Sequence, residues 1–132
     1  PPQAHVLNLL VPLQQHRSLS YLFIAHDLTV VRYLADRIAV MYLGKIVETA
    51  DSDPLCARPM HPYTQALFAA ALPSHPDDPP HERPIAGEVP SALSLPSGCR
   101  FHPRCPAAMP ICSEVEPALK ARGGGEVACH LY

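Results

Sequence analysis

Tyr21-Leu22-Phe23-Ile24-Ala25-His26-Asp27 is the stretch of the sequence that decides the fold class. Its first five residues form a continuous apolar run of aromatic and aliphatic side chains. Such a run is typical of a strand buried on both faces, as in a parallel sheet that is covered by helices. The polar pair that follows predicts the end of the strand and the start of the next element.

A helix is predicted before this run. Residues 3–16 place Val6, Leu10 and Leu13 on one helical face, at spacings of four and three. Pro12 lies inside the same pattern. Because an interior proline removes a backbone hydrogen bond, it predicts a kink or an earlier end of this helix.

A second helix is predicted directly after the run. Leu28, Val31 and Ala35 fall on one face, and Asp27 stands where a carboxylate can cap the first turn. The apolar face predicts that this helix packs against a core.

A β-hairpin is predicted next. Residues 37–42 have the composition of a strand, Leu43-Gly44 that of a turn, and residues 45–48 that of the partner strand. Strands together with helices predict an α/β fold.

Two more helices are predicted after the hairpin. Residues 51–57 fit a short one, and His61-Pro62 begins another, because proline is well tolerated in the first helical turn. This helix is expected to stop at Pro73. Tyr63 is expected to be a packing residue on this helix rather than a ligand.

Proline and cysteine divide the chain into three regions. Residues 1–72 are rich in aliphatic side chains and form the predicted α/β part. Residues 73–96 contain seven prolines, which predicts an extended surface linker. Residues 97–132 hold four of the five cysteines and are too few to bury enough apolar surface by themselves.

The overall composition excludes several classes of protein. A net charge of −2 and a pI near 6.5 argue against nucleic acid as a partner. No apolar run approaches the roughly 20 residues that span a bilayer, and the first residues do not resemble a secretory signal. Because the chain begins with proline and not methionine, we expect a fragment of a larger cytoplasmic protein.

His26 allows two interpretations from its position alone. Ligands of open α/β sheets bind at the carboxyl ends of the strands, where an imidazole can meet a phosphate oxygen or orient a water. His26 could instead only help to cap the following helix beside Asp27.

Four clustered cysteines are candidate metal ligands. They are Cys99, Cys105, Cys112 and Cys129. Their spacing lacks the close pairs of usual zinc sites, and a cytoplasmic chain does not keep disulfides. Four thiolates suit a [4Fe–4S] cluster, but spacing alone favours iron–sulfur and Zn²⁺ equally. His102 or His130 could replace a thiolate in a zinc site, whereas Cys56 is predicted to be an ordinary buried thiol.

Several segments resemble, in order, one protein family. Residues 23–31 resemble the switch-histidine segment of ABC-transporter ATPases, and residues 36–48 resemble the hairpin that follows it. Residues 59–67 are similar to the His-Pro-Tyr segment of the oligopeptide/dipeptide importer subfamily. Residues 87–91 and 98–106 resemble the C-terminal extension of that subfamily.

The resemblance implies the C-terminal portion of a P-loop ABC-ATPase domain, then a proline-rich linker and a small Cys-rich domain. It implies that His26 contacts the γ-phosphate of ATP, bound with Mg²⁺, and supports the attacking water in a closed dimer. It favours a [4Fe–4S] cluster over Zn²⁺ at the four cysteines. The implied function is to couple ATP hydrolysis to the import of peptides or nickel.

The implied partners are a second ATP-binding subunit, transmembrane permease subunits and, through them, a peptide-binding protein. They would place the chain peripherally on the cytoplasmic face of the inner membrane. The sequence lacks the family's phosphate-binding loop, signature sequence and Mg²⁺-side carboxylates, so we expect the chain alone to be an inactive ATPase. The alternative hypothesis is a stand-alone metal-binding or regulatory module without ATPase activity.

Overall fold

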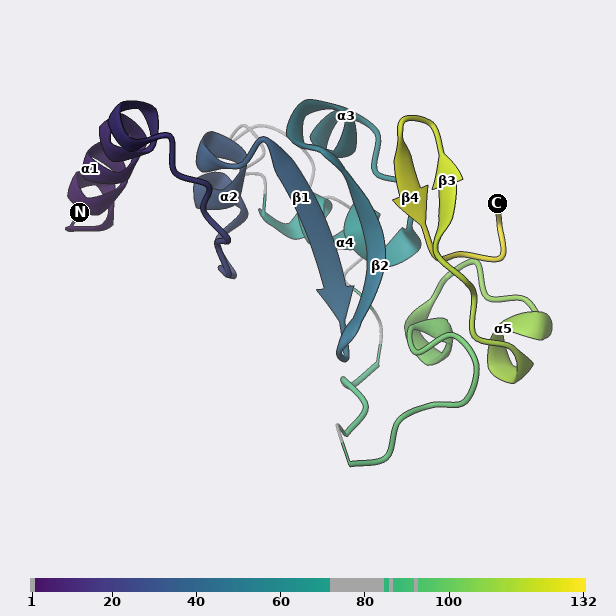
Figure 1. Ribbon diagram of the computed structural model, residues 1–132. Helices are drawn as coiled ribbons and strands as arrows, with labels where there is room; N and C mark the ends of the chain where they lie inside the picture. Colours follow the sequence, from purple (N-terminus) through teal and green to yellow (C-terminus); the bar gives the residue numbers. More distant parts are fainter. Residues whose placement is uncertain (1, 72–84, 86, 92) are drawn as a thin grey trace, which may run out of the picture.

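The four strands of the computed structural model form one antiparallel sheet in the order β1-β2-β4-β3 (Figure 1). The structure describes residues 2–71, 85, 87–91 and 93–132. The strand bounds are Arg37–Tyr42 for β1, Lys45–Asp51 for β2, Lys120–Arg122 for β3 and Gly125–Val127 for β4. The described part of the chain is therefore an α/β fold with an antiparallel sheet.

The helices precede, follow and flank the β1–β2 hairpin (Figure 1). Their bounds are Pro2–Arg17 for α1, Leu28–Leu34 for α2, Ser52–Ala57 for α3, Pro62–Ala71 for α4, His102–Arg104 for the 3₁₀ helix η1 and Ile111–Glu114 for α5. None of the helices in the described ranges is both long and apolar enough to cross a bilayer.

The predicted hairpin is confirmed. Along β1, Ile38, Val40 and Tyr42 are buried and alternate with exposed residues, as expected for a strand with one face on the core. Leu43 and Gly44 form the two-residue connection, both with positive φ, which matches the right-handed twist of the strands.

The second helix and its cap are also confirmed. Asp27 Oδ1 accepts hydrogen bonds from the backbone N–H groups of Thr29 (2.9 Å) and Val30 (3.3 Å). These bonds satisfy two of the donors that a helix start leaves without a partner. Leu28, Val31 and Ala35 pack against the core formed by the hairpin, α3 and α4.

The start of α4 follows the His61-Pro62 prediction. His61 Nδ1 accepts a hydrogen bond from the Tyr63 backbone N–H (3.1 Å), and Pro62 occupies the first helical position. The Glu48 carboxylate accepts hydrogen bonds from the N–H groups of Met60 (2.7 Å) and His61 (2.9 Å). Strand β2 thus fixes the start of α4, and Tyr63 is a packing residue as predicted, half-buried against the core.

Phe101 brings the cysteine-containing region into this core. Its side chain is 1% exposed and lies against the rings of Tyr42 (centroid distance 5.2 Å), Tyr63 (5.4 Å) and His61 (5.8 Å). Such aromatic groups contribute both apolar burial and edge-to-face contacts. Residues more than thirty positions apart therefore share one core.

The sheet itself also continues into the C-terminal region. Strand β4 pairs with β2 through Glu48↔Val127 and Thr49↔Glu126. The Ala128 N–H donates a further hydrogen bond to the Val47 carbonyl (2.8 Å). The boundaries proposed at residues 72 and 96 stay a prediction, and most of the predicted linker lies outside the described residues.

We expect Gly125→Ala to weaken this junction. A Cβ on Gly125 would lie 2.4 Å from the Thr49 carbonyl oxygen and 2.6 Å from Ala50 Cβ, so the two strands would have to separate. The free energy of unfolding should fall by about 1–3 kcal/mol, measured by urea denaturation. Ala121→Ser, on the exposed strand β3, should change it by less than about 0.5 kcal/mol.

The predicted strand at residues 21–25 is wrong for this chain. The segment contains no strand, and Leu22 and Ile24 are each 92% exposed. The apolar run predicts burial between two layers, but no strand of the described residues lies beside it to complete a parallel ladder. The Tyr21 hydroxyl of this segment donates a 3.4 Å hydrogen bond to the Leu10 carbonyl of α1.

Of the two expectations for Pro12, a kink or an earlier end of the first helix, the earlier end is wrong. Helix α1 continues through Pro12 to Arg17. A proline removes one backbone donor, and the bonds of the neighbouring turns suffice to continue the helix. The helix ends where Ser18 takes a left-handed conformation and the Leu19 N–H donates to the Gln14 carbonyl (3.2 Å).

Candidate functional site

His26 lies on the surface at the turn between the extended segment and α2. The next residue, Asp27, has extended backbone angles (φ −91°, ψ 107°), and the helix begins one residue later. The imidazole is therefore presented at the N-terminal end of an anchored helix. It is neither sealed in the core nor held by a neighbouring strand among the described residues.

The four predicted cysteine ligands occupy one neighbourhood, and all are free thiols. Burial raises the pKa of the Cys99, Cys105 and Cys129 thiols, and nearby cysteines raise it further. Cys112 is among those neighbours in each case and is itself buried. The fold thus brings together four residues that span 31 positions of the sequence.

Backbone amides point at these sulfur atoms. The N–H groups of Phe101 and His102 lower the pKa of Cys99, that of Ala107 lowers the pKa of Cys105, and that of Leu131 lowers the pKa of Cys129. The Met109 N–H donates to Cys112 Sγ (3.4 Å). Amide donors favour the thiolate form, which is the form that binds metals.

The sulfur atoms are not drawn together around a single ion. No three His, Cys, Asp or Glu side chains in the described residues are arranged to hold a metal ion. The ring nitrogens of His102 and His130 hydrogen-bond instead to the carbonyls of Cys99 (2.9 Å) and Val115 (2.8 Å). Cys56, predicted to be buried, is half-buried and packs against the hydrophobic core.

The cysteine region is tied to the tip of the β1–β2 hairpin. The Arg100 guanidinium donates to the Leu43 carbonyl, where the hairpin turns. Lys45 and Glu116 form an ion pair (2.7 Å), and this bond is the main cause that lowers the pKa of Glu116. The position of the cysteine loops is therefore set by the hairpin.

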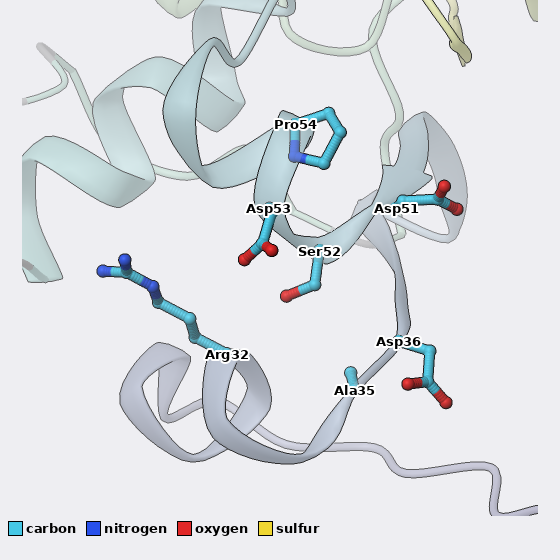
Figure 2. A pocket seen from close by; sticks show the side chains of 7 residues that line it. All are labelled: Arg32, Ala35, Asp36, Asp51, Ser52, Asp53 and Pro54. Carbon is cyan, nitrogen blue, oxygen red and sulfur yellow. The ribbon is translucent and has the colours of Figure 1, made fainter.

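A hollow of about 490 Å³ lies between α2 and α3 (Figure 2). Arg32 reaches in from α2, and the Asp53 carboxylate and the Ser52 hydroxyl point into it from α3 (Figure 2). The Ser52 hydroxyl is buried and has no hydrogen-bond partner among the residues that the structure describes. None of the sequence-predicted site residues lines this hollow.

Sequence reasoning missed two residues that organise these regions. Glu48 is buried and joins β2 to α4, and Phe101 fills the space between the hairpin and the cysteine loops. In the sequence, Glu48 looks like an exposed strand residue. Phe101 could have been suspected from the sequence, because it is a large aromatic residue between two cysteines, Cys99 and Cys105.

One family model matches the chain: "Oligopeptide/dipeptide transporter, C-terminal region", over residues 47–112. The match begins in β2, includes the buried Glu48 and the start of α4, and ends at Cys112. The chain belongs to this family. The resemblance stated from the sequence is confirmed to that extent, and the stand-alone metal-binding alternative receives no support from it.

Curated relatives are similar over nearly the whole chain. A probable peptide ABC transporter ATP-binding protein of Sinorhizobium fredii is 52% identical over 130 residues, 98% of this chain and 37% of the relative. A dipeptide transport ATP-binding protein of Escherichia coli is 47% identical over 127 residues, 96% of this chain and 38% of the relative. An oligopeptide transport ATP-binding protein of Bacillus subtilis is 47% identical over 133 residues, which cover 98% of this chain and 40% of the relative. The chain thus spans less than half the length of these relatives.

Proposed function

We propose that this chain is the C-terminal part of the ATP-binding subunit of an ABC importer for peptides. The observation that carries the proposal is the 52% identity, over 98% of the chain, to a protein named as a peptide ABC transporter ATP-binding protein. In this role the chain works with a second ATP-binding subunit and with membrane-embedded permease subunits, on the cytoplasmic side of the membrane. A peptide-binding protein delivers the substrate.

His26 is the residue through which this chain takes part in hydrolysis. Its exposed imidazole, at the start of an anchored helix, can accept or donate a hydrogen bond toward the terminal phosphate of ATP and its attacking water. The rest of the subunit supplies the phosphate-binding loop and the Mg²⁺ site. ATP supplies the free energy for transport.

The test is a chimeric subunit in which this chain replaces the matching 130 residues of the Sinorhizobium fredii relative. The chimera should hydrolyse ATP, and His26→Ala should lower kcat by about a hundredfold. His16→Ala, at the exposed end of α1, is the matched control and should leave kcat unchanged. A chimera that binds ATP without hydrolysing it, or that hydrolyses it equally well without His26, would contradict the proposal. The 132-residue chain alone should show no turnover.

We further propose that the four cysteines hold a [4Fe–4S] cluster. Four free thiols in one neighbourhood match the Cys₄ ligand set, and the backbone amides that point at them suit sulfur atoms bound to iron. Because the side chains do not surround a single ion, binding would require Cys99, Cys105, Cys112 and Cys129 to rotate inward. Zn²⁺ is the alternative occupant.

Anaerobic purification of the chain, with an absorbance spectrum and iron, sulfide and zinc assays, tests this second proposal. About four iron and four sulfide ions per chain are expected, and Cys112→Ser should lose them. Cys56→Ser is the matched control and should keep them. A colourless, iron-free protein that is replete with zinc would end the iron–sulfur assignment.

A further inference from the structure

Asp27 connects the candidate catalytic residue to the anchored part of the fold. One carboxylate oxygen accepts the N–H groups of Thr29 and Val30, and the Asp27 carbonyl accepts the N–H of Val31 (3.1 Å). These three bonds hold the Asp27 side chain and carbonyl in the first turn of α2, where the Asp27 backbone takes extended angles (φ −91°, ψ 107°). His26 is joined directly to this fixed residue.

Helix α2, which Asp27 caps, is itself held in place by packing against the core. Its apolar face, with Leu28 and Val31, packs against the hairpin core. Its C-terminal end is held as well, since the Ser52 N–H of α3 donates to the Asp36 carbonyl (2.9 Å). A short helix of seven residues gains most of its stability from such packing and from its cap.

The segment before His26 offers no comparable support. Leu22 and Ile24 are almost fully exposed, and the described residues contain no strand beside this segment. Within the described part of the chain, the support for the His26 position therefore comes from its C-terminal side. Asp27 is the first link on that side.

We propose that Asp27 is a positioning residue for His26: its carboxylate, by capping α2, holds the imidazole where the terminal phosphate of ATP is met. This inference rests on the proposed function. Asp27 does not contact substrate, and its role is the hydrogen bonding of the cap, not its charge. Residues that cap equally well should therefore replace it.

The experiment uses the intact chimeric subunit and steady-state ATP hydrolysis. Asp27→Ala should lower kcat about tenfold, which corresponds to about 1.4 kcal/mol and lies within the range of about 0.5–2 kcal/mol that a lost cap costs, and should leave KM for ATP nearly unchanged. Asp27→Asn and Asp27→Ser, which retain a capping oxygen, should stay within about threefold of the parent. Asp36→Ala removes an exposed carboxylate at the other end of α2 and should have no effect.

A double-mutant comparison separates positioning from other roles. In a His26→Ala background, Asp27→Ala should cause no further loss of kcat, because there is no imidazole left to position. An equal loss in Asp27→Asn and Asp27→Ala, or an additive loss without His26, would overturn the inference. If His26→Ala itself leaves kcat unchanged, the proposed function fails; if only Asp27→Ala is silent, the function stands and this inference alone is wrong.

Discussion

Phe101→Ala is expected to lower the free energy of unfolding of the 132-residue chain by about 3–5 kcal/mol. The ring is 1% exposed and contacts the rings of Tyr42, Tyr63 and His61, which belong to β1 and to the start of α4. Removing it leaves a cavity at the place where the hairpin, α4 and the cysteine loops meet. A domain of this size is stable by only about 5–15 kcal/mol, so the loss is a large part of the total.

Urea denaturation, monitored by circular dichroism, measures this loss in the free energy of unfolding. Phe101→Leu keeps much of the apolar volume and should cost less than about 1.5 kcal/mol, whereas Leu93→Ala, at a side chain that is 99% exposed, should cost almost nothing. If Phe101→Ala unfolds at the same urea concentration as the parent, the cysteine region does not share the core of the hairpin.

The shared core has a consequence for the proposed cluster. A ligand that binds only the folded form stabilises it, and the loop from Cys99 to Cys105 contains both Phe101 and Arg100. Cluster binding should therefore stabilise the hairpin tip at Leu43 as well as the loop. The coupling runs in both directions, because a loosened core would also weaken the cysteine site.

The sequence predicted the elements whose causes are local. The β1–β2 hairpin follows from alternating apolar residues around Leu43-Gly44. Helix α2 follows from its apolar face and from the Asp27 cap, and α4 follows from Pro62 at its first position. In each case the residues that determine the element lie within a few positions of it.

The failed and missed features have nonlocal causes. The segment at residues 21–25 has the composition of a buried strand, but burial requires neighbouring layers, which the described residues do not provide. The pairing of β4 with β2 joins positions nearly eighty residues apart, and neither strand's pattern predicts its partner. For the candidate site, the sequence predicts four cysteines as possible ligands, which stays a prediction, but it does not predict the amides that point at their sulfur atoms, because those depend on loop conformation.

The second large effect is a loss of folding stability at low pH. We expect the chain to lose about 3 kcal/mol of stability as the pH falls from 6.5 to 4, from His61 alone. Burial lowers the pKa of His61 from 6.5 to about 4. Its Nδ1 accepts the Tyr63 N–H, and its backbone N–H is held by the Glu48 carboxylate on β2. The hydrogen bond that His61 accepts at the start of α4 therefore requires the neutral ring.

The direction of this pH dependence follows from proton binding. Between pH 6.5 and 4 the unfolded chain protonates His61, while the folded chain does not, so acid favours the unfolded state. Above pH 6.5 the ring is neutral in both states and the effect vanishes.

Carboxylates titrate in the same pH range, so the informative quantity is the difference in unfolding free energy between variants. His61→Asn keeps an oxygen that can accept the Tyr63 N–H but cannot be protonated there, and its stability should fall less steeply with acid than that of the parent. His16→Asn, at an exposed position, should reproduce the parent slope. Parallel curves of unfolding free energy against pH for the parent and His61→Asn would show that His61 is protonated in the fold, and that the start of α4 does not depend on its neutral ring.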